Sequence, residues 1–178
     1  MKRILMATDF STRSDRALRR AVFLAGKQGA ALTLVHVVDD DQPRALVDQQ
    51  ARAARTLLEE GARTIAEVDR VPADAVVTTG DAFAGILRVS DEVEPELIVV
   101  GPHRRQFLDT FIGTTAERTI RRGNRPVLMA NAVPTGAYQR SLLAIDFDEA
   151  SSAAVKAARQ LGMLAGTDVM ALHLFEMP

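Results

Sequence analysis

The residues best suited to chemistry lie between Leu97 and Val127. A short apolar run, Leu97 to Val100, ends at Gly101. A polar, basic loop follows, and Gly113-Thr114-Thr115 then opens a segment of helical character. The first N–H groups of a helix have no partner inside it, so a phosphate oxygen can satisfy them. Strand, glycine turn and helix N-terminus are the parts from which α/β proteins build anion sites. The pattern fits a phosphate loop and, equally, a plain strand-to-helix connection that holds no ligand.

Three basic residues in this loop could meet phosphate oxygens. Arg104 and Arg105 carry guanidinium groups, which pair well with phosphate. His103 could donate a hydrogen bond, although its cationic neighbours disfavour the protonated ring. The other two histidines, His36 and His173, lie inside apolar runs. We interpret these two as packed, hydrogen-bonded core residues.

Two residues near expected helix starts have two interpretations each. Asp9 follows the first apolar run and either hydrogen-bonds a ligand or stabilises the start of the next helix, where Ser11 or Thr12 is the expected cap. Thr114 either offers its hydroxyl to phosphate or caps its helix in a capping box with Glu117, three residues on. Both roles of Thr114 can hold together, because its side-chain and backbone donors are separate.

The composition and the missing motifs exclude several classes of function. The 178-residue chain has no cysteine, which excludes disulfides, thiolate catalysis and Cys-ligated metals. Its histidines have no carboxylates at metal-ligand spacing, so no metal site is expected. No Walker lysine, nucleophile elbow or carboxylate pair is present, so we expect no catalytic residue and at most a weak ATPase.

Charge and hydropathy bound the expected partners and location. A net charge of −1 gives no reason to expect nucleic acid or a membrane as a partner. The basic cluster Arg118, Arg121 and Arg122 is interpreted as the solvated face of a helix. No apolar run is long enough for a signal peptide core or a membrane span, so a cytoplasmic location is expected.

Short apolar runs alternate with segments of helical periodicity over residues 1–131. This alternation predicts an α/β fold with a doubly wound, five-stranded parallel sheet. In such sheets ligands bind beyond the carboxyl ends of the strands. The turns that hold Asp9, Val37, Gly80 and Gly101 all lie at those ends. The expected strands are residues 4–7, 31–38, 75–79, 97–100 and 127–130.

The end of the chain repeats its beginning. A shift of 137 positions (146 − 9 = 137) aligns the two segments without a gap, which favours a duplicated domain. The second copy, residues 138–178, follows a linker at 132–137 and holds a strand, a helix and a strand. Such a unit cannot bury its apolar faces alone, so we expect it to pack on another chain or to extend the first sheet. The aligned residues are Asp146-Phe147 with Asp9-Phe10, Ser151 with Ser14, Gly166 with Gly29, and His173 with His36.

Taken together, these residues resemble the universal stress protein family. The resemblance covers residues 1–131 as a whole domain and 138–178 as the first third of another, so the chain looks like a tandem member with a truncated second domain. The matching segments are Thr8-Asp9-Phe10-Ser11, Leu34-Val35-His36-Val37, Gly80, Val99-Val100-Gly101-Pro102-His103, Gly113-Thr114-Thr115 and Arg125-Pro126-Val127-Leu128.

The resemblance implies a fold, a ligand and a partner. The implied sheet order is 3-2-1-4-5, as in adenine nucleotide alpha hydrolase-like folds. The implied partner is a second copy, bound through the last strand; the apolar faces of residues 138–178 offer the C-terminal fragment as another contact. One branch of the family binds ATP, with any Mg²⁺ carried by the nucleotide. By analogy, Asp9 and Val37 would hold the adenine and ribose, and the loop from Gly101 to Thr115 the phosphates. The implied nucleotide-binding residues are Thr8, Asp9, Phe10, Val37, Gly80, Gly101, His103, Arg104, Arg105, Gly113, Thr114 and Thr115.

The glycine motif of that branch is altered in this sequence. The family pattern is Gly, two residues, Gly, nine residues, then Gly-Ser/Thr. Here Arg104 stands at the second glycine, and eight residues, Arg105 to Ile112, separate it from Gly113. Glycine allows close backbone approach to a phosphate, which arginine obstructs unless its guanidinium meets the phosphate instead. Two functions follow: a stress-response module that binds ATP, or a universal stress protein without nucleotide that acts through dimerisation and protein–protein interaction.

Overall fold

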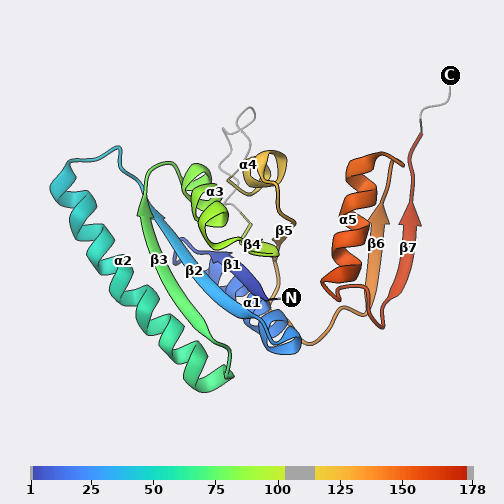
Figure 1. Cartoon of the computed structure of the whole chain (residues 1–178), viewed down its shortest axis with the longest axis horizontal. Helices are drawn as coiled ribbons and strands as arrows, with labels where there is room; N and C mark the ends of the chain where they lie inside the picture. The colour runs from blue at the N-terminus through green and yellow to red at the C-terminus, as the bar shows by residue number, and fades with distance from the viewer. Residues whose placement is uncertain (1, 103–114, 176–178) are drawn as a thin grey trace. The chain divides into compact units, whose positions relative to one another are not determined.

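Runs of aliphatic residues form the strands of the first part of the chain. In the computed structural model, which describes residues 2–102 and 115–175 (Figure 1), five parallel strands form one sheet in the order β3-β2-β1-β4-β5. The predicted α/β fold and its strand order are confirmed. The strands are β1 (Arg3–Ala7), β2 (Ala31–Val38), β3 (Ala73–Thr79), β4 (Leu97–Val100) and β5 (Val127–Met129).

Helices cover both faces of this sheet, which explains the continuous apolar runs of its central strands. Every residue of β4 is buried, and Ile4, Leu5 and Met6 of β1 have no exposed surface. Strand β1 pairs with β2 on one side and β4 on the other, so it lies at the centre of the core. The helices are α1 (Thr12–Gln28), α2 (Arg44–Thr64) with its π-helical continuation η1 (Ile65–Asp69), α3 (Ala82–Val93) and α4 (Thr115–Arg122).

The helix ends follow local sequence signals. The Ser11 hydroxyl accepts a hydrogen bond from the Ser14 N–H at 3.3 Å and caps α1, as one of the two expected cap residues. Helix α1 ends at Gly29, which has a φ of 62°. Asp81 caps α3 by accepting from the Ala84 N–H at 3.1 Å. These caps fix where α1 and α3 begin, beside the carboxyl ends of the strands.

A second unit follows the first. The chain divides into residues 1–134 and 135–178. The second unit consists of β6 (Arg140–Ala144), α5 (Glu149–Gln160) and β7 (Asp168–Leu172), with β6 and β7 parallel. The shift of 137 positions places β1 on β6 and the first residues of α1 and β2 on those of α5 and β7.

The two units also share their local geometry. Phe10 and Phe147 adopt left-handed backbone conformations with φ of 60° and 64°. The Nδ1 atoms of His36 and His173 each lie 2.8 Å from a carbonyl oxygen 28 residues earlier. Each histidine ring packs on the phenylalanine, with centroids 4.5 and 4.7 Å apart. The repeat in sequence is therefore a repeat in conformation.

No helix within the described ranges combines the length and the apolar character that crossing a membrane requires.

The packing of α3 and of α2 on the sheet predicts opposite effects for two glycine substitutions, one in each helix. A methyl group added at Gly85 would lie 2.7 and 2.8 Å from the two γ-carbons of Val37. Overpacking costs about 1–3 kcal/mol, which exceeds the roughly 0.5–1 kcal/mol that alanine contributes to a helix. Gly85→Ala should therefore lower the free energy of unfolding in urea titrations. Gly61→Ala should raise it, because a methyl there meets only Leu34 Cδ1 at 3.9 Å. Equal effects of the two substitutions would contradict this packing.

Candidate functional site

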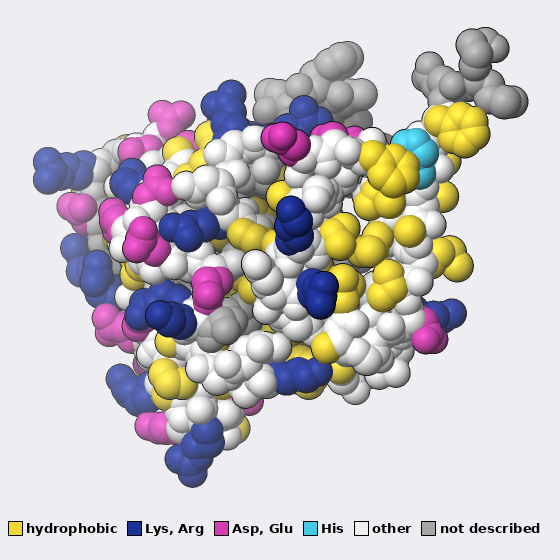
Figure 2. All heavy atoms as spheres, turned by 45° about the vertical axis from the view of Figure 1, so that its right-hand side comes forward, with side chains coloured by type: hydrophobic (Ala, Val, Ile, Leu, Met, Phe, Trp, Pro, Cys, Tyr) yellow, Lys and Arg dark blue, Asp and Glu magenta, His cyan; other side chains and the backbone are white. Residues whose placement is uncertain are grey.

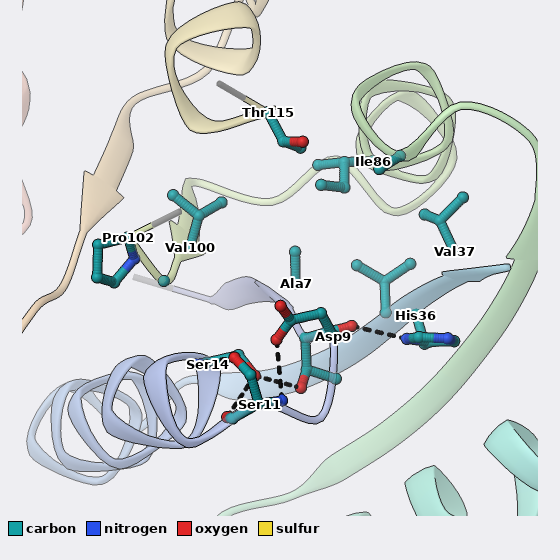
Figure 3. Close-up of a pocket in the computed structure, with 14 residues that line it drawn as sticks. Ala7, Asp9, Ser11, Ser14, His36, Val37, Ile86, Val100, Pro102 and Thr115 are labelled. Atoms are coloured by element: carbon teal, nitrogen blue, oxygen red, sulfur yellow. Dashed lines mark hydrogen bonds between the residues drawn. The ribbon is translucent and has the colours of Figure 1, made fainter. Parts of the chain in front are cut away.

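A cavity opens where β1, β2 and β4 end (Figure 3). The empty space between its walls amounts to about 650 Å³, counting the part open to solvent. The starts of α1, α3 and α4 complete its wall. The lining residues are Ala7, Thr8, Asp9, Ser11, Ser14, Val35, His36, Val37, Ala82, Ile86, Val100, Gly101, Pro102 and Thr115.

The turn between β1 and α1 is held by a hydrogen-bond network. The Thr8 hydroxyl accepts from the Phe10 N–H at 3.0 Å and lies 3.0 Å from the hydroxyl of Ser14. A carboxylate oxygen of Asp9 accepts from the Ser11 N–H at 3.0 Å. Between them, Phe10 takes a left-handed conformation that costs a non-glycine residue about 1 kcal/mol. The network compensates that strain and fixes the Asp9 side chain at the cavity.

Asp9 carries a negative charge at neutral pH. Burial against the cavity wall raises the pKa of its carboxyl. Hydrogen bonds from the hydroxyls of Ser11 and Ser14 and from backbone N–H groups outweigh that effect, so the pKa lies below its usual value of 3.8. The carboxylate can therefore only accept hydrogen bonds, and it suits a ligand that presents hydroxyl or amino donors.

His36 has a structural hydrogen bond at the edge of the cavity. Its Nδ1 lies 2.8 Å from the carbonyl oxygen of Thr8. Because a carbonyl oxygen only accepts, Nδ1 carries the hydrogen and the neutral ring has a fixed tautomer. The ring also packs on Phe10. The interpretation of His36 as a packed, hydrogen-bonded residue agrees with this geometry, whereas its twin His173 keeps the hydrogen bond but is exposed.

An apolar wall lies beside the Asp9 carboxylate. Figure 3 shows Val37, Ile86 and Val100 bordering the hollow, with Asp9 facing it from the β1 turn. Ile86 and Val100 belong to the same core cluster and are almost fully buried. An apolar wall next to a hydrogen-bond acceptor suits a small ligand with an apolar body and hydroxyl or amino donors.

Gly101 allows β4 and α1 to approach each other. A Cβ atom at this position would lie 3.0 Å from both the Cα and the backbone nitrogen of Ser14. Any side chain here would therefore push the start of α1 away from the cavity. The requirement for glycine comes from this contact between backbones within the protein.

Helix α4 is held at the cavity by a basic residue. Arg118 forms an ion pair with the α3 cap residue Asp81 at 3.1 Å, and its guanidinium lies 3.9 Å from the centroid of the Phe83 ring. These contacts tie α4 to the start of α3 and place Thr115 at the mouth of the cavity. The prediction that Arg118 lies on a solvated helix face is thus partly wrong, because its side chain contacts Asp81 and Phe83.

The predicted site residues fall into three groups. Those that line the cavity are Thr8, Asp9, Val37, Gly101 and Thr115. Phe10 and Gly80 are not among the lining residues: Phe10 packs on His36, and Gly80 lies in the turn before α3 with a φ of 122°. The remaining residues lie outside the described ranges: His103, Arg104, Arg105, Gly113 and Thr114.

Sequence reasoning did not select several residues that the fold brings to the cavity. Ser14, Ile86 and Pro102 line it, and Arg118 positions α4. One signal pointed to Ser14, which is repeated as Ser151 in the second copy. Helical spacing places Ile86 on the apolar side of α3, where it is buried, but no short motif marks that side as the wall of a cavity.

The hydrogen bonds to Asp9 predict a pH-dependent effect of Asp9→Asn. A carboxyl whose pKa is lowered by folding stabilises the protein above the pKa of the unfolded state, and that contribution is lost as the pH falls through the folded-state pKa. The variant should therefore be less stable than the parent at pH 7, and the difference should shrink once the pH falls below 3.8. Chemical denaturation at several pH values measures this. Asp91→Asn, on an exposed part of α3, controls for loss of charge alone; a difference for Asp9→Asn that does not vary with pH would refute the prediction.

Comparisons with known proteins agree with this architecture. The family model described as Universal stress protein family matches residues 1–131. Universal stress protein A homolog 1 of Coxiella burnetii is 28% identical over 124 residues, which cover 65% of this chain and 85% of that protein. The crystal structure of a universal stress protein family member from Burkholderia pseudomallei is 30% identical, with a TM-score of 0.62, over 74% of this chain and 96% of that one.

A longer solved structure matches both units. The crystal structure of a universal stress protein from Archaeoglobus fulgidus aligns with 96% of this chain and 65% of its own, with a TM-score of 0.77 and 20% identity. At that identity the likeness concerns the fold. Since the family model spans the first unit with its complete sheet and cavity, this chain belongs to the universal stress protein family.

Proposed function

We propose that the chain binds an adenine nucleotide in the cavity at the ends of β1, β2 and β4, and acts as a cytoplasmic stress-response module that binds rather than turns over its ligand. One observation carries the proposal: an ionised carboxylate, Asp9, borders an apolar wall at the carboxyl end of the sheet. Ligands of doubly wound sheets bind at this end.

The charge of Asp9 favours one orientation of the nucleotide. Ribose hydroxyls and the adenine amino group donate hydrogen bonds that a carboxylate accepts, whereas phosphates near it would be repelled. The base and sugar therefore lie against Asp9 and Val37. The phosphates point towards Gly101 and Thr115, where α4 begins and its N-terminal dipole favours anions. Any Mg²⁺ arrives with the phosphates, because Mg²⁺ needs few protein ligands.

Two related structures support this ligand class. One is a crystal structure of a universal stress protein in complex with cAMP, 23% identical to this chain with a TM-score of 0.59. The other is a family protein from Arabidopsis thaliana with AMP bound, 18% identical with a TM-score of 0.54. The likeness to these two structures shows a shared fold, and cAMP and AMP are ligands of those two proteins.

A second function is favoured by the altered motif and by the last strand of the sheet. Arg104 replaces a glycine of the ATP-binding pattern. Strand β5 forms the edge of the sheet, and Met129 at its end is about half exposed. An uncovered edge strand is a template for pairing with another chain. In this alternative the protein binds no nucleotide and acts as a homodimer through β5.

Nucleotide titration of the full chain distinguishes the two functions. A ligand that binds only the folded state raises the free energy of unfolding, by about 2.7 kcal/mol at 100 times its Kd. The melting temperature therefore rises. We expect ATP, ADP and AMP to raise it, and calorimetry to give a Kd that Asp9→Asn weakens about 10-fold or more, since hydrogen bonds to charged groups contribute about 1.5–3 kcal/mol. Asp146→Asn, the twin substitution in the second unit, should leave the Kd unchanged. No shift with any of these nucleotides at millimolar concentration would favour the second function.

The tie between α4 and α3 predicts a selective effect of Arg118→Ala. This substitution removes the contacts with Asp81 and Phe83 that place α4 at the phosphate end of the cavity. It should weaken ATP binding several-fold but leave adenosine binding unchanged, because adenosine has no phosphate. Arg121→Ala, an exposed residue in the last turn of the same helix, is the matched control. Equal losses for ATP and adenosine would mean that Arg118 acts on the whole fold.

A further inference from the structure

The cavity lining has little in it to hold an anion by charge. Among the described residues that line the cavity there is one carboxylate, Asp9, and there is no lysine or arginine. Figure 2 shows Lys and Arg side chains interspersed with Asp and Glu side chains, so the face in that view carries no broad basic patch. Within the described residues, a positive partner for a polyphosphate must therefore come from just outside this lining.

Arg118 lies beside the mouth of the cavity. It stands three residues after Thr115 on α4, and positions three apart lie on the same side of a helix. Its Nη1 atom lies 3.1 Å from Oδ2 of Asp81, which directly precedes the lining residue Ala82. Figure 3 shows Thr115 of α4 and Ile86 of α3 facing the same hollow. The guanidinium is thus held between two helix starts that both border the cavity.

The ion pair between Arg118 and Asp81 can be exchanged at little cost. The two side chains are 38% and 51% exposed, and ion pairs at such exposure contribute little to stability. Asp81 has a second role that does not need Arg118, because its Oδ1 atom accepts from the Ala84 N–H at 3.1 Å and caps α3. Breaking the ion pair therefore leaves the start of α3 in place.

The stacking of Arg118 on Phe83 supports the guanidinium during such an exchange. The ring of Phe83 is 9% exposed, and the guanidinium carbon lies 3.9 Å from its centroid. A guanidinium directs its N–H donors outward in its own plane, whereas the ring contacts its face. The partner at the edge can therefore change while the ring still holds the group beside the cavity.

We propose that Arg118 binds the phosphates of a nucleoside diphosphate or triphosphate and gives up Asp81 when it does so. This inference rests on the proposed nucleotide function and names the ligand class within it. A phosphate group can meet the guanidinium fork with two oxygens, whereas the ion pair with Asp81 uses one, because the other oxygen caps α3. The exchange therefore favours the phosphate.

Competition with Asp81 makes the site selective for highly charged ligands. The attraction between a guanidinium and a nucleotide grows with the number of negative charges on the nucleotide. Adenosine gains nothing from Arg118, and AMP competes with Asp81 less effectively than ADP or ATP. We expect ATP to bind several-fold more tightly than AMP in calorimetry at one ionic strength, and Arg118→Ala to bring the two affinities together.

The sign of the effect of Asp81→Asn tests the exchange. Asparagine caps a helix about as well as aspartate, so α3 should keep its start. Neutralising the competitor should tighten ATP binding about 2- to 5-fold, the strength of an exposed ion pair, and leave adenosine binding unchanged. Calorimetry on the full chain measures both, and unchanged adenosine binding shows that the cavity is intact. Weaker ATP binding would mean that the pair serves only to hold α4, and unchanged ATP binding would mean that Asp81 does not compete; either result overturns the proposal.

A double substitution separates the exchange from a general loss of negative charge. Asp81→Asn should have no effect on ATP binding in the Arg118→Ala background, because no guanidinium is left to release. Tightening of equal size in both backgrounds would show that Asp81 repels the phosphates directly, against the proposal. Asp40→Asn is the matched control, since a Cβ atom at the preceding residue Gly80 would lie 3.9 Å from Asp40 Oδ2. This control should leave ATP binding unchanged.

The same titrations distinguish this inference from the function on which it rests. If the unsubstituted chain binds neither adenosine nor ATP, the nucleotide function and the role of Arg118 both fail. If it binds adenosine, AMP and ATP with equal affinity, the nucleotide function stands and the role of Arg118 fails.

Discussion

The placement of β1 between β2 and β4 is the constraint on which the rest of the first unit depends. Parallel pairing on both sides aligns the carboxyl ends of the three strands, so these ends meet at one cavity, together with the turn after β1 and Gly101 and Pro102 after β4. This placement requires a strand with no exposed surface, and Ile4, Leu5 and Met6 supply it. Asp9 owes its position to this pairing, because its turn begins where β1 ends.

Much of the site could be predicted because strand ends are visible in the sequence. Apolar runs that stop at polar or glycine residues marked Asp9, Val37 and Gly101, and all three line the cavity. The contribution of α3 was not predictable in the same way. Helical spacing places Ile86 on the apolar side of α3, but the close approach of Gly85 to Val37 arises only once the layers pack.

Long-range polar contacts were the hardest to predict. Arg118 and Asp81 are 37 positions apart, and no spacing rule relates them. The local basic cluster on α4 indicated a solvated surface, which is the usual fate of arginines on helices. The repeat was more informative than composition, because one shift in the sequence gave matching strands, turns and side-chain hydrogen bonds in both units.

The turn before the first helix has the same shape in both units but a different charge. Where the first unit caps its helix with the neutral hydroxyl of Ser11, the second uses the carboxylate of Asp148, whose oxygen accepts from the Ser151 N–H. Asp148 lies two residues after Asp146, whose pKa is lowered by hydrogen bonds led by that of the Ser151 hydroxyl. Two anionic groups in one turn create a negative potential that repels polyphosphates. A polyphosphate near this turn would therefore meet two carboxylates, Asp146 and Asp148, where the matching turn of the first unit has one, Asp9.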